Sequence, residues 1–226
     1  MKMIQDLHSH TYYSNCGRDE PELVVRAAIE GGIQMLGITD HNYGIGARKK
    51  EYYEEMCALR DRFAPQIKIL PAIEIATIDG KCIGDDEDIT WAEYCLVEHI
   101  DQKESCVGPD IVKFAKRCGI KTGIAHTDIF AMLERENEDP LKYFRHLAEN
   151  GVFWEMNVNY DSIHKYREHA YVKRFCEDED QQRIIRESGI EISVGFDGHR
   201  VEDYLPGRVA DMCRLLEKLK IPMPFC

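Results

Sequence analysis

The strongest constraint in the sequence is the repeated placement of ionisable side chains at or near the ends of apolar, β-branched runs. Seven such runs are expected to form strands, at residues 3–8, 35–39, 67–75, 94–99, 122–125, 152–157 and 191–195. Helix-like segments separate most of them, which predicts an α/β protein with a parallel sheet. The carboxyl ends of parallel barrel strands share one face, so side chains at those ends are expected to meet.

Helix signals mark several of the connecting segments. Residues 19–32 have Asp19 as a candidate N-cap, an early proline and a pair of glycines as a stop. Residues 108–119 and 139–151 repeat this design, and residues 209–220 are typical of a closing amphipathic helix. No linker or repeat divides the chain, so residues 1–226 are predicted to form one domain. Seven strand–helix units would make a barrel one unit short of the common eight.

Composition excludes several classes of protein. The formal net charge of −12 argues against an extended nucleic-acid partner. No apolar run approaches the roughly 20 residues of a membrane span. Nine cysteines without a C-x-x-C pair fit free thiols in a reducing cytosol better than a disulfide framework. We therefore expect a cytoplasmic protein with no membrane contact, and the oligomeric state stays open.

The ionisable residues at the strand ends predict a metal centre. His8 and His10 stand two residues apart, so in a strand they project to the same side, and Asp197 and His199 repeat that spacing. The other candidates are His41, Glu74, His99 and His126. These donors are too many for one tetrahedral ion and suit two or three divalent ions that share a carboxylate. Imidazoles beside carboxylates favour Zn²⁺, Mn²⁺ or Fe over Mg²⁺.

Five further ionisable residues are expected to have supporting or surface positions. Asp6 and Asp40 neighbour candidate ligands, and each could either orient an imidazole or cap a strand end. His146, His164 and His169 lie in charged, helix-like segments and are expected to be exposed helix residues.

Six short motifs resemble one known family. In order, "DLHSHT", "GITDH", "PAIEI", "LVEHID", "GIAHTD" and "SVGFDGHR" are similar to the PHP (polymerase and histidinol phosphatase) domain of metal-dependent phosphoesterases. The resemblance covers nearly the whole chain. It implies a distorted (β/α)7 barrel of parallel strands, with a trinuclear metal site at the C-terminal ends of the strands.

The resemblance also implies roles for particular residues. The first metal would be held by His8, His10, Glu74 and Asp197, and the second by Glu74, as a bridge, with His99 and His126. His41 and His199 would hold the third metal, with Cys16 as the expected further ligand, at a position where many relatives place a histidine. Arg200 is the expected phosphate clamp, because guanidinium donates two parallel hydrogen bonds, and Arg18 is a second candidate for substrate binding.

The function expected from this pattern is hydrolysis of a small phosphate monoester by metal-activated water, with histidinol phosphate as the best-known family substrate. Glu74, Asp197 and Arg200 are the expected catalytic residues. Three alternatives remain open: a phosphodiesterase acting on nucleotides or oligonucleotide ends, an amidohydrolase-like C–N hydrolase, and a non-catalytic, metal-stabilised interaction module. The amidohydrolase class also begins with H-x-H on a barrel strand, but Glu74 stands where a bridging lysine is often found.

Overall fold

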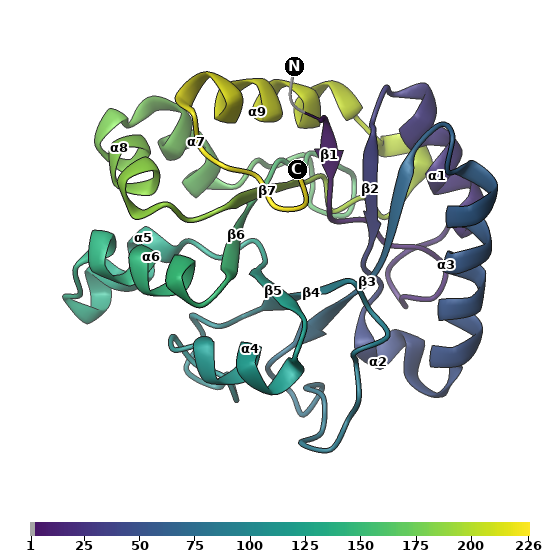
Figure 1. Ribbon diagram of the computed structural model, residues 1–226, viewed down its shortest axis with the longest axis horizontal. Coiled ribbons are helices and arrows are strands. Elements are labelled where there is room, and N and C mark those ends of the chain that lie inside the picture. Colours follow the sequence, from purple (N-terminus) through teal and green to yellow (C-terminus); the bar gives the residue numbers. More distant parts are fainter. Residues whose placement is uncertain (1–2) are drawn as a thin grey trace.

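Seven parallel strands form one sheet that curls into a nearly closed barrel, as the computed structural model of residues 3–226 shows (Figure 1). The strands are hydrogen-bonded in chain order. Their bounds are β1 (Gln5–Asp6), β2 (Met35–Ile38), β3 (Lys68–Ala76), β4 (Tyr94–Glu98), β5 (Lys121–Ile124), β6 (Val152–Asn157) and β7 (Ile192–Gly195). This architecture confirms the predicted seven-stranded α/β barrel.

The barrel closes where β1 meets β7, which lie beside one another in Figure 1. Leu7 N donates to Val194 O over 2.8 Å, and Asp197 N donates to His8 O over 2.7 Å. Because His8 and Asp197 are both candidate ligands, the seam that closes the barrel also fixes part of the candidate site.

Helices surround the barrel and cover its outer face (Figure 1). They are α1 (Pro21–Glu30), α2 (Asn42–Ile45), the 3-10 turn η1 (Gly46–Arg48), α3 (Lys49–Phe63), α4 (Val112–Cys118), α5 (Ile129–Glu136), α6 (Pro140–Glu149), α7 (Ala170–Glu177), α8 (Glu179–Ser188), η2 (Val201–Asp203) and α9 (Pro206–Leu219). Packing of apolar side chains between the two layers is dense; Trp154 of β6, for example, is fully buried with its ring 5.3 Å from that of Phe144 in α6. Within residues 3–226, no helix is both long and apolar enough to cross a membrane.

The predicted strand bounds agree with the observed ones to within one residue at each end, except for the first strand. Residues 3–8 are predicted to be extended, but β1 pairs with β2 only over Gln5–Asp6, and the hydrogen bonds of Leu7 and His8 go to the segment of β7 instead. Two helix starts also differ from expectation, since α4 begins at Val112 and α9 at Pro206. Asp19 does not cap α1; its carboxylate accepts a hydrogen bond from Val201 N at 2.7 Å.

Side chains that face the barrel interior are apolar near the amino ends of the strands, which form its base, and charged near the carboxyl ends, which form its mouth. Leu70 and Ala72 of β3 precede Glu74 on the same face of the strand, and Tyr94 and Leu96 lead in the same way to the end of β4. The apolar layer consists of Leu7, Met35, Leu70, Ala72, Tyr94, Leu96, Ala125 and Phe153, which form one buried cluster. Carboxylates therefore follow the apolar layer toward the carboxyl ends of the strands.

The C-terminal segment covers the base of this inner cluster. The Phe225 ring lies 5.3 Å from that of Tyr94 and 6.4 Å from that of Phe153. Gln5 Nε2 donates to Pro224 O over 3.0 Å, which ties the segment to β1. The last residues of the chain therefore complete the packing of the barrel interior.

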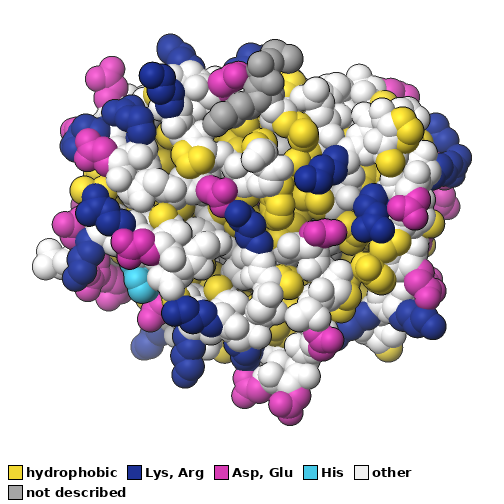
Figure 2. Space-filling view, in the orientation of Figure 1, with side chains coloured by type: hydrophobic (Ala, Val, Ile, Leu, Met, Phe, Trp, Pro, Cys, Tyr) yellow, Lys and Arg dark blue, Asp and Glu magenta, His cyan; other side chains and the backbone are white. Residues whose placement is uncertain are grey.

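The molecular surface mixes charges of both signs on the face shown in Figure 2, with hydrophobic side chains between them. Lysine and arginine do not gather into one patch on this face, and histidine is visible only near its left margin.

One glycine makes room for the inner cluster, and its substitution tests this packing. A Cβ at Gly37 would lie 1.7 Å from the hydroxyl of Tyr94, which donates to Leu7 O over 2.6 Å. We expect Gly37→Ala to lower the free energy of unfolding by about 2–4 kcal/mol, through overpacking and a displaced buried hydrogen bond. Chemical denaturation would measure the change.

The matched control is Gly207→Ala in α9, where an added Cβ meets no atom within 4 Å. That substitution should raise stability by up to about 1 kcal/mol. Tyr94→Phe should recover part of the loss in a Gly37→Ala background, because it removes the nearest clashing atom. Equal stabilities for the two alanine variants would contradict the proposed clash.

Candidate metal centre

The Glu74 carboxylate lies at the middle of the candidate site, with four imidazoles around it. Its Oε1 atom is 3.3 Å from His8 Nε2 and 3.1 Å from His126 Nε2. Its Oε2 atom is 3.3 Å from His10 Nε2 and 3.1 Å from His41 Nδ1. Glu74 itself is only 1% exposed. The ends of β1, β2, β3 and β5 therefore converge on one buried carboxylate, as the sequence predicted.

Asp197, which follows the end of β7, contacts His8 and His10. Its Oδ1 atom lies 3.1 Å from His10 Nε2 and 3.4 Å from His8 Nε2. The two Nε2 atoms are 3.1 Å apart, so the side chains of the H-x-H motif do point to the same place.

Glu155 of β6 contacts the nitrogen of the His8 ring that faces away from Glu74. Its Oε1 atom is 2.7 Å from His8 Nδ1, and its Oε2 atom accepts from His126 N over 2.9 Å. A Cβ at Gly195 would lie 2.1 Å from Glu155 Oε1 and 2.5 Å from His8 Cβ, so only glycine fits there. Sequence reasoning missed Glu155, although it lies one alternation beyond the inward-facing Phe153.

Asp40 orients His10 through Ser14, rather than by direct contact. The Ser14 hydroxyl donates to Asp40 Oδ1 over 2.6 Å and lies 3.1 Å from His10 Nδ1. Asp40 also accepts from the backbone and hydroxyl of Thr11. The carboxylate of Asp6 instead accepts from the backbone N of Phe196 and His8, and burial raises its pKa to about 6. Of the two aspartates, Asp40 is thus the one linked to a candidate ligand ring.

The fourth strand brings Glu98 to the site, where the sequence predicted His99. Because Tyr94 and Leu96 face inward, the period of two turns Glu98 inward as well. Its Oε2 atom is 3.6 Å from His126 Nε2, while the His99 and His126 ring centroids stand 6.1 Å apart. His99 has a left-handed φ of 65°, and its Nδ1 atom is 3.3 Å from Glu98 Oε2. The structure therefore gathers Glu98, and not His99, with the central donors.

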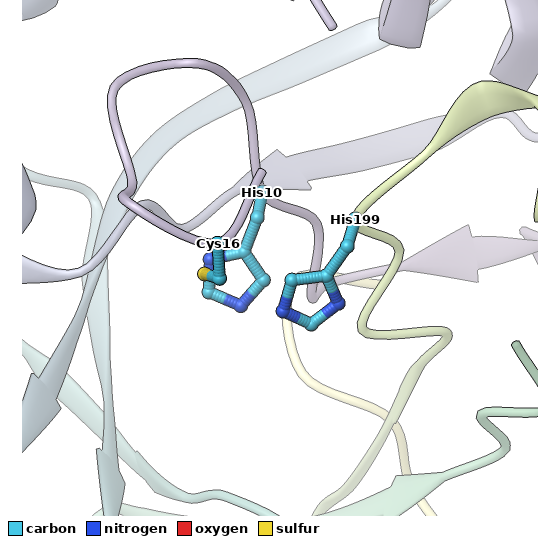
Figure 3. Close-up of side chains that lie close together, drawn as sticks. All are labelled: His10, Cys16 and His199. Carbon is cyan, nitrogen blue, oxygen red and sulfur yellow. The ribbon is translucent and has the colours of Figure 1, made fainter. Parts of the chain in front are cut away.

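Cys16 lies beside His10 and His199. The loop after β1 folds back so that Cys16 returns to His10, and His199 enters from the loop after β7 (Figure 3). The sulfur and one nitrogen from each ring all lie within 4.8 Å of one another, and the two rings stack with centroids 4.5 Å apart. The sequence placed Cys16 with His199 and His41; the structure groups it with His199 and His10, and places His41 with Glu74 and His10.

Of the three histidines expected on exposed helices, only His146 fits that expectation, on α6. His169 is half-buried at the start of α7, and its ring stacks 6.1 Å from that of His126. His164 lies in a turn between β6 and α7, where its Nε2 atom is 3.8 Å from Asp197 Oδ2. The expectation for His164 was wrong because a helix-like charge pattern gave no sign that this segment folds over the site.

The two arginines proposed for phosphate binding are connected to His199 through the backbone. Arg18 is exposed, and its backbone N donates to His199 O over 3.1 Å. Arg200 is partly buried and its guanidinium lies 3.7 Å from the carboxylate of Glu202. A guanidinium has no lone pair to offer a metal ion, so neither arginine is a candidate ligand.

The buried charges shift one another's pKa values. Burial would lower the pKa of His10, but its contacts with Asp197 and Glu74 outweigh burial and raise the pKa to about 9. Burial is likewise outweighed by Glu74 at His126, whose pKa is also raised to about 9. Burial, reinforced by the charge of Glu74, raises the pKa of Glu98 to about 8. Without ions, protons on the imidazoles therefore offset the concentrated negative charge, a role that metal cations would take over.

The donor set fits divalent metal ions. Groups of three donors within 4.8 Å among the described residues are His8, His10 and Asp197; His10, His41 and Glu74; Glu74, Glu98 and His126; His10, Cys16 and His199; and Asp161, His164 and His199. Several residues belong to more than one group, so neighbouring ions could share them. His41 Nδ1 is buried and, within residues 3–226, makes no hydrogen bond, which leaves its lone pair for a cation. Nitrogen, oxygen and sulfur donors together suit Zn²⁺ and similar ions better than Mg²⁺.

Comparison with known proteins agrees with this geometry. The pattern of the PHP domain matches residues 6–218. A protein of Acetivibrio thermocellus named as a probable phosphatase is 25% identical over 231 residues, covering 98% of this chain and 89% of that protein.

Two solved structures share the fold. The histidinol phosphate phosphatase of Lactococcus lactis, in complex with zinc, L-histidinol and phosphate, has a TM-score of 0.66 at 16% identity, covering 97% of this chain and 94% of that one. The second structure is a metal-dependent tyrosine phosphatase, one of a pair from Bacillus subtilis and Streptococcus pneumoniae. It has a TM-score of 0.56 at 18% identity, covering 93% of this chain and 86% of that one. At these identities the likeness shows the fold alone.

Cys16 offers a test of the donor group in Figure 3. We expect Cys16→Ser to lower the bound metal by about one equivalent, because a hydroxyl is a poor replacement for a thiolate, and Cys16→His to restore it. Metal analysis after dialysis would measure the stoichiometry.

The control is Cys57→Ser, since Cys57 is also half-buried but lies in α3. Wild-type metal content in Cys16→Ser would assign Cys16 to packing and leave His10 and His199 without a sulfur partner.

Proposed function

The chain belongs to the PHP domain family, and from that premise we propose that it is a metal-dependent phosphoesterase that hydrolyses a small phosphate monoester. The observation that carries the proposal is the Glu74 carboxylate, which is buried among four imidazoles and shared by two groups of donors. The resemblance to a probable phosphatase supports a phosphate ester as the substrate. Histidinol phosphate, for which the similar enzyme of Lactococcus lactis is named, is one candidate.

The residues of the chain would hold and orient the centre. Divalent ions, when bound, supply a lowered pKa for water and neutralise charge on phosphate oxygens. Glu74 would bridge two such ions through its two oxygens. Glu155 fixes the ring of His8, and Ser14 fixes that of His10, so the donor atoms face the site before any ion arrives.

A cavity between α7 and α9, lined by none of the candidate ligands, approaches them through Asn157 and His169 and has room for the organic part of a small substrate. Its volume is about 470 Å³, within the usual range for small-molecule sites. Asn157, which lines it, has its amide nitrogen 3.3 Å from Asp197 Oδ2, and His169, another lining residue, stacks on His126. Charged side chains lie along the cavity, including the ion-paired Lys173. This lining suits a polar metabolite.

The phosphate group would lie near His199, whose carbonyl oxygen accepts from the backbone of Arg18 and which Arg200 follows in the chain. Arg18 is exposed and free to move toward a ligand. Arg200 pairs with the exposed Glu202 over 3.7 Å, an interaction of the strength that a phosphate can displace. Arginine suits this role because its guanidinium binds two phosphate oxygens at once.

The reaction class is tested by a panel of substrates under matched metal loading. We expect hydrolysis of an aryl phosphate monoester with added Mn²⁺ or Zn²⁺. A chelator should abolish the activity, because the ions lower the pKa of the water that attacks the phosphate. Release of phosphate and of the aryl alcohol would be measured for monoesters, diesters and amides. Cleavage of diesters or amides without monoesters would overturn the proposal, and no cleavage of any class would favour an interaction module.

Two substitutions should separate metal binding from phosphate binding. Glu74→Gln should lower metal affinity by more than the roughly 10–100-fold typical of a residue that only orients a ligand, and kcat should fall with it. Arg200→Ala should raise KM and leave metal content unchanged, because a guanidinium has no lone pair with which to bind a metal ion. Metal analysis beside steady-state kinetics would test both, and equal metal loss in the two variants would refute this division of roles.

A further inference from the structure

The segment between β6 and α7, residues 158–169, is fastened over one end of the metal centre. Asn159 Nδ2 donates to Phe196 O over 3.2 Å and to Asp197 O over 3.1 Å. These bonds attach the segment to the backbone that carries a candidate ligand. The segment therefore occupies a defined place beside Asp197, although its sequence is charged and irregular.

Within this segment, Asp161 and His164 form a close pair. Asp161 is 1% exposed, and its Oδ1 atom accepts from the backbone N of His164 and lies 2.8 Å from His164 Nδ1. An ionised carboxylate can only accept, so Nδ1 carries the ring proton and Nε2 carries a lone pair. Metal-bound histidines typically have this arrangement, in which a carboxylate holds the nitrogen opposite to the ion.

The lone pair of His164 faces an oxygen that the central donors do not use. Asp197 Oδ1 is the atom close to His8 and His10, whereas Oδ2 lies 3.8 Å from His164 Nε2 and 3.3 Å from Asn157 Nδ2. Two ligands of a tetrahedral zinc ion stand about 3.4 Å apart, given bonds of about 2.0–2.1 Å. A small movement of the side chains would therefore let both atoms bind one ion.

A second observation points to a cation at this place. Asp161 Oδ2 is buried and, within residues 3–226, accepts no hydrogen bond, although it lies 3.6 Å from His199 Nδ1. Asp161, His164 and His199 also offer donor atoms within 4.8 Å of one another. A buried carboxylate oxygen without a hydrogen-bond partner is costly, and the charge of an ion on the far side of the His164 ring would offset that cost without binding Asp161 directly.

We propose that His164 is a further metal ligand, which binds through Nε2 an ion that Asp197 Oδ2 also binds, with Asp161 holding the ring in position. The ion would then tie the segment of residues 158–169 to the barrel mouth, in addition to the bonds made by Asn159. The inference goes beyond the proposed function, because it depends on the metal centre and not on the kind of bond that is hydrolysed.

The test compares His164→Gln and Asp161→Asn with His146→Gln, a matched control on the exposed face of α6. Zinc binding would be measured by equilibrium dialysis, and coordination by the visible spectrum of the Co²⁺-substituted protein. His164→Gln should weaken binding of one ion by about tenfold or more and change the Co²⁺ spectrum. Asp161→Asn should weaken binding of the same ion to a smaller extent, and His146→Gln should match the wild type.

A conservative replacement guards against misfolding as an explanation. His164→Cys provides another metal-binding side chain and should retain the ion that His164→Gln loses, with circular dichroism as the check on folding. Wild-type affinity and an unchanged Co²⁺ spectrum in His164→Gln would overturn the proposal, as would equal loss in the Cys and Gln variants. A wild-type protein that binds metal but cleaves no phosphoester would refute the proposed function alone, since these measurements use no substrate.

Discussion

The rest of the structure depends on the contacts between the buried, negatively charged carboxylate of Glu74 and the imidazoles around it. A carboxylate this deep costs several kcal/mol unless opposite charge or hydrogen bonds reach it. The compensating groups come from the ends of two other strands, at His8, His10 and His126. They meet only if the sheet curls far enough for β1 to bond with β7. Closure of the barrel and assembly of the site are therefore one event.

Most of the donor rings are positioned by hydrogen bonds to their far nitrogen. Glu155 contacts His8 Nδ1, Ser14 contacts His10 Nδ1, and the carbonyl oxygen of Asp197 lies 2.8 Å from His199 Nδ1. Each bond fixes both the tautomer and the ring plane, so fewer degrees of freedom are lost when an ion binds. The arrangement also explains why polar residues behind the ligands are as deeply buried as the ligands themselves.

The strands and the meeting of their ends could be predicted from the sequence, because apolar runs and strand-end histidines are local signals. The alternation of Tyr94 and Leu96 in β4 also predicts that Glu98 faces inward, whereas the motif "LVEHID" favours His99 as the ligand. The backbone changes conformation at His99, where φ is 65°, and this change leaves Glu98 as the inward-facing residue. His164 could not have been predicted in the same way. Its charged, helix-like sequence predicts an exposed helix, whereas its position depends on tertiary bonds that no local pattern records.

The closing role of the last few residues has a consequence for synthesis of the protein. The chain leaves the ribosome from its N-terminus, so β1 emerges long before β7 and the segment that carries Phe225. Until then the nascent sheet has an open edge at β1, and the side chains around Tyr94 lack their cover. Such long-range pairing is slow, and an exposed edge invites association between chains. The intermediate most open to association is thus a chain in which β1 to β6 have emerged and β7 has not.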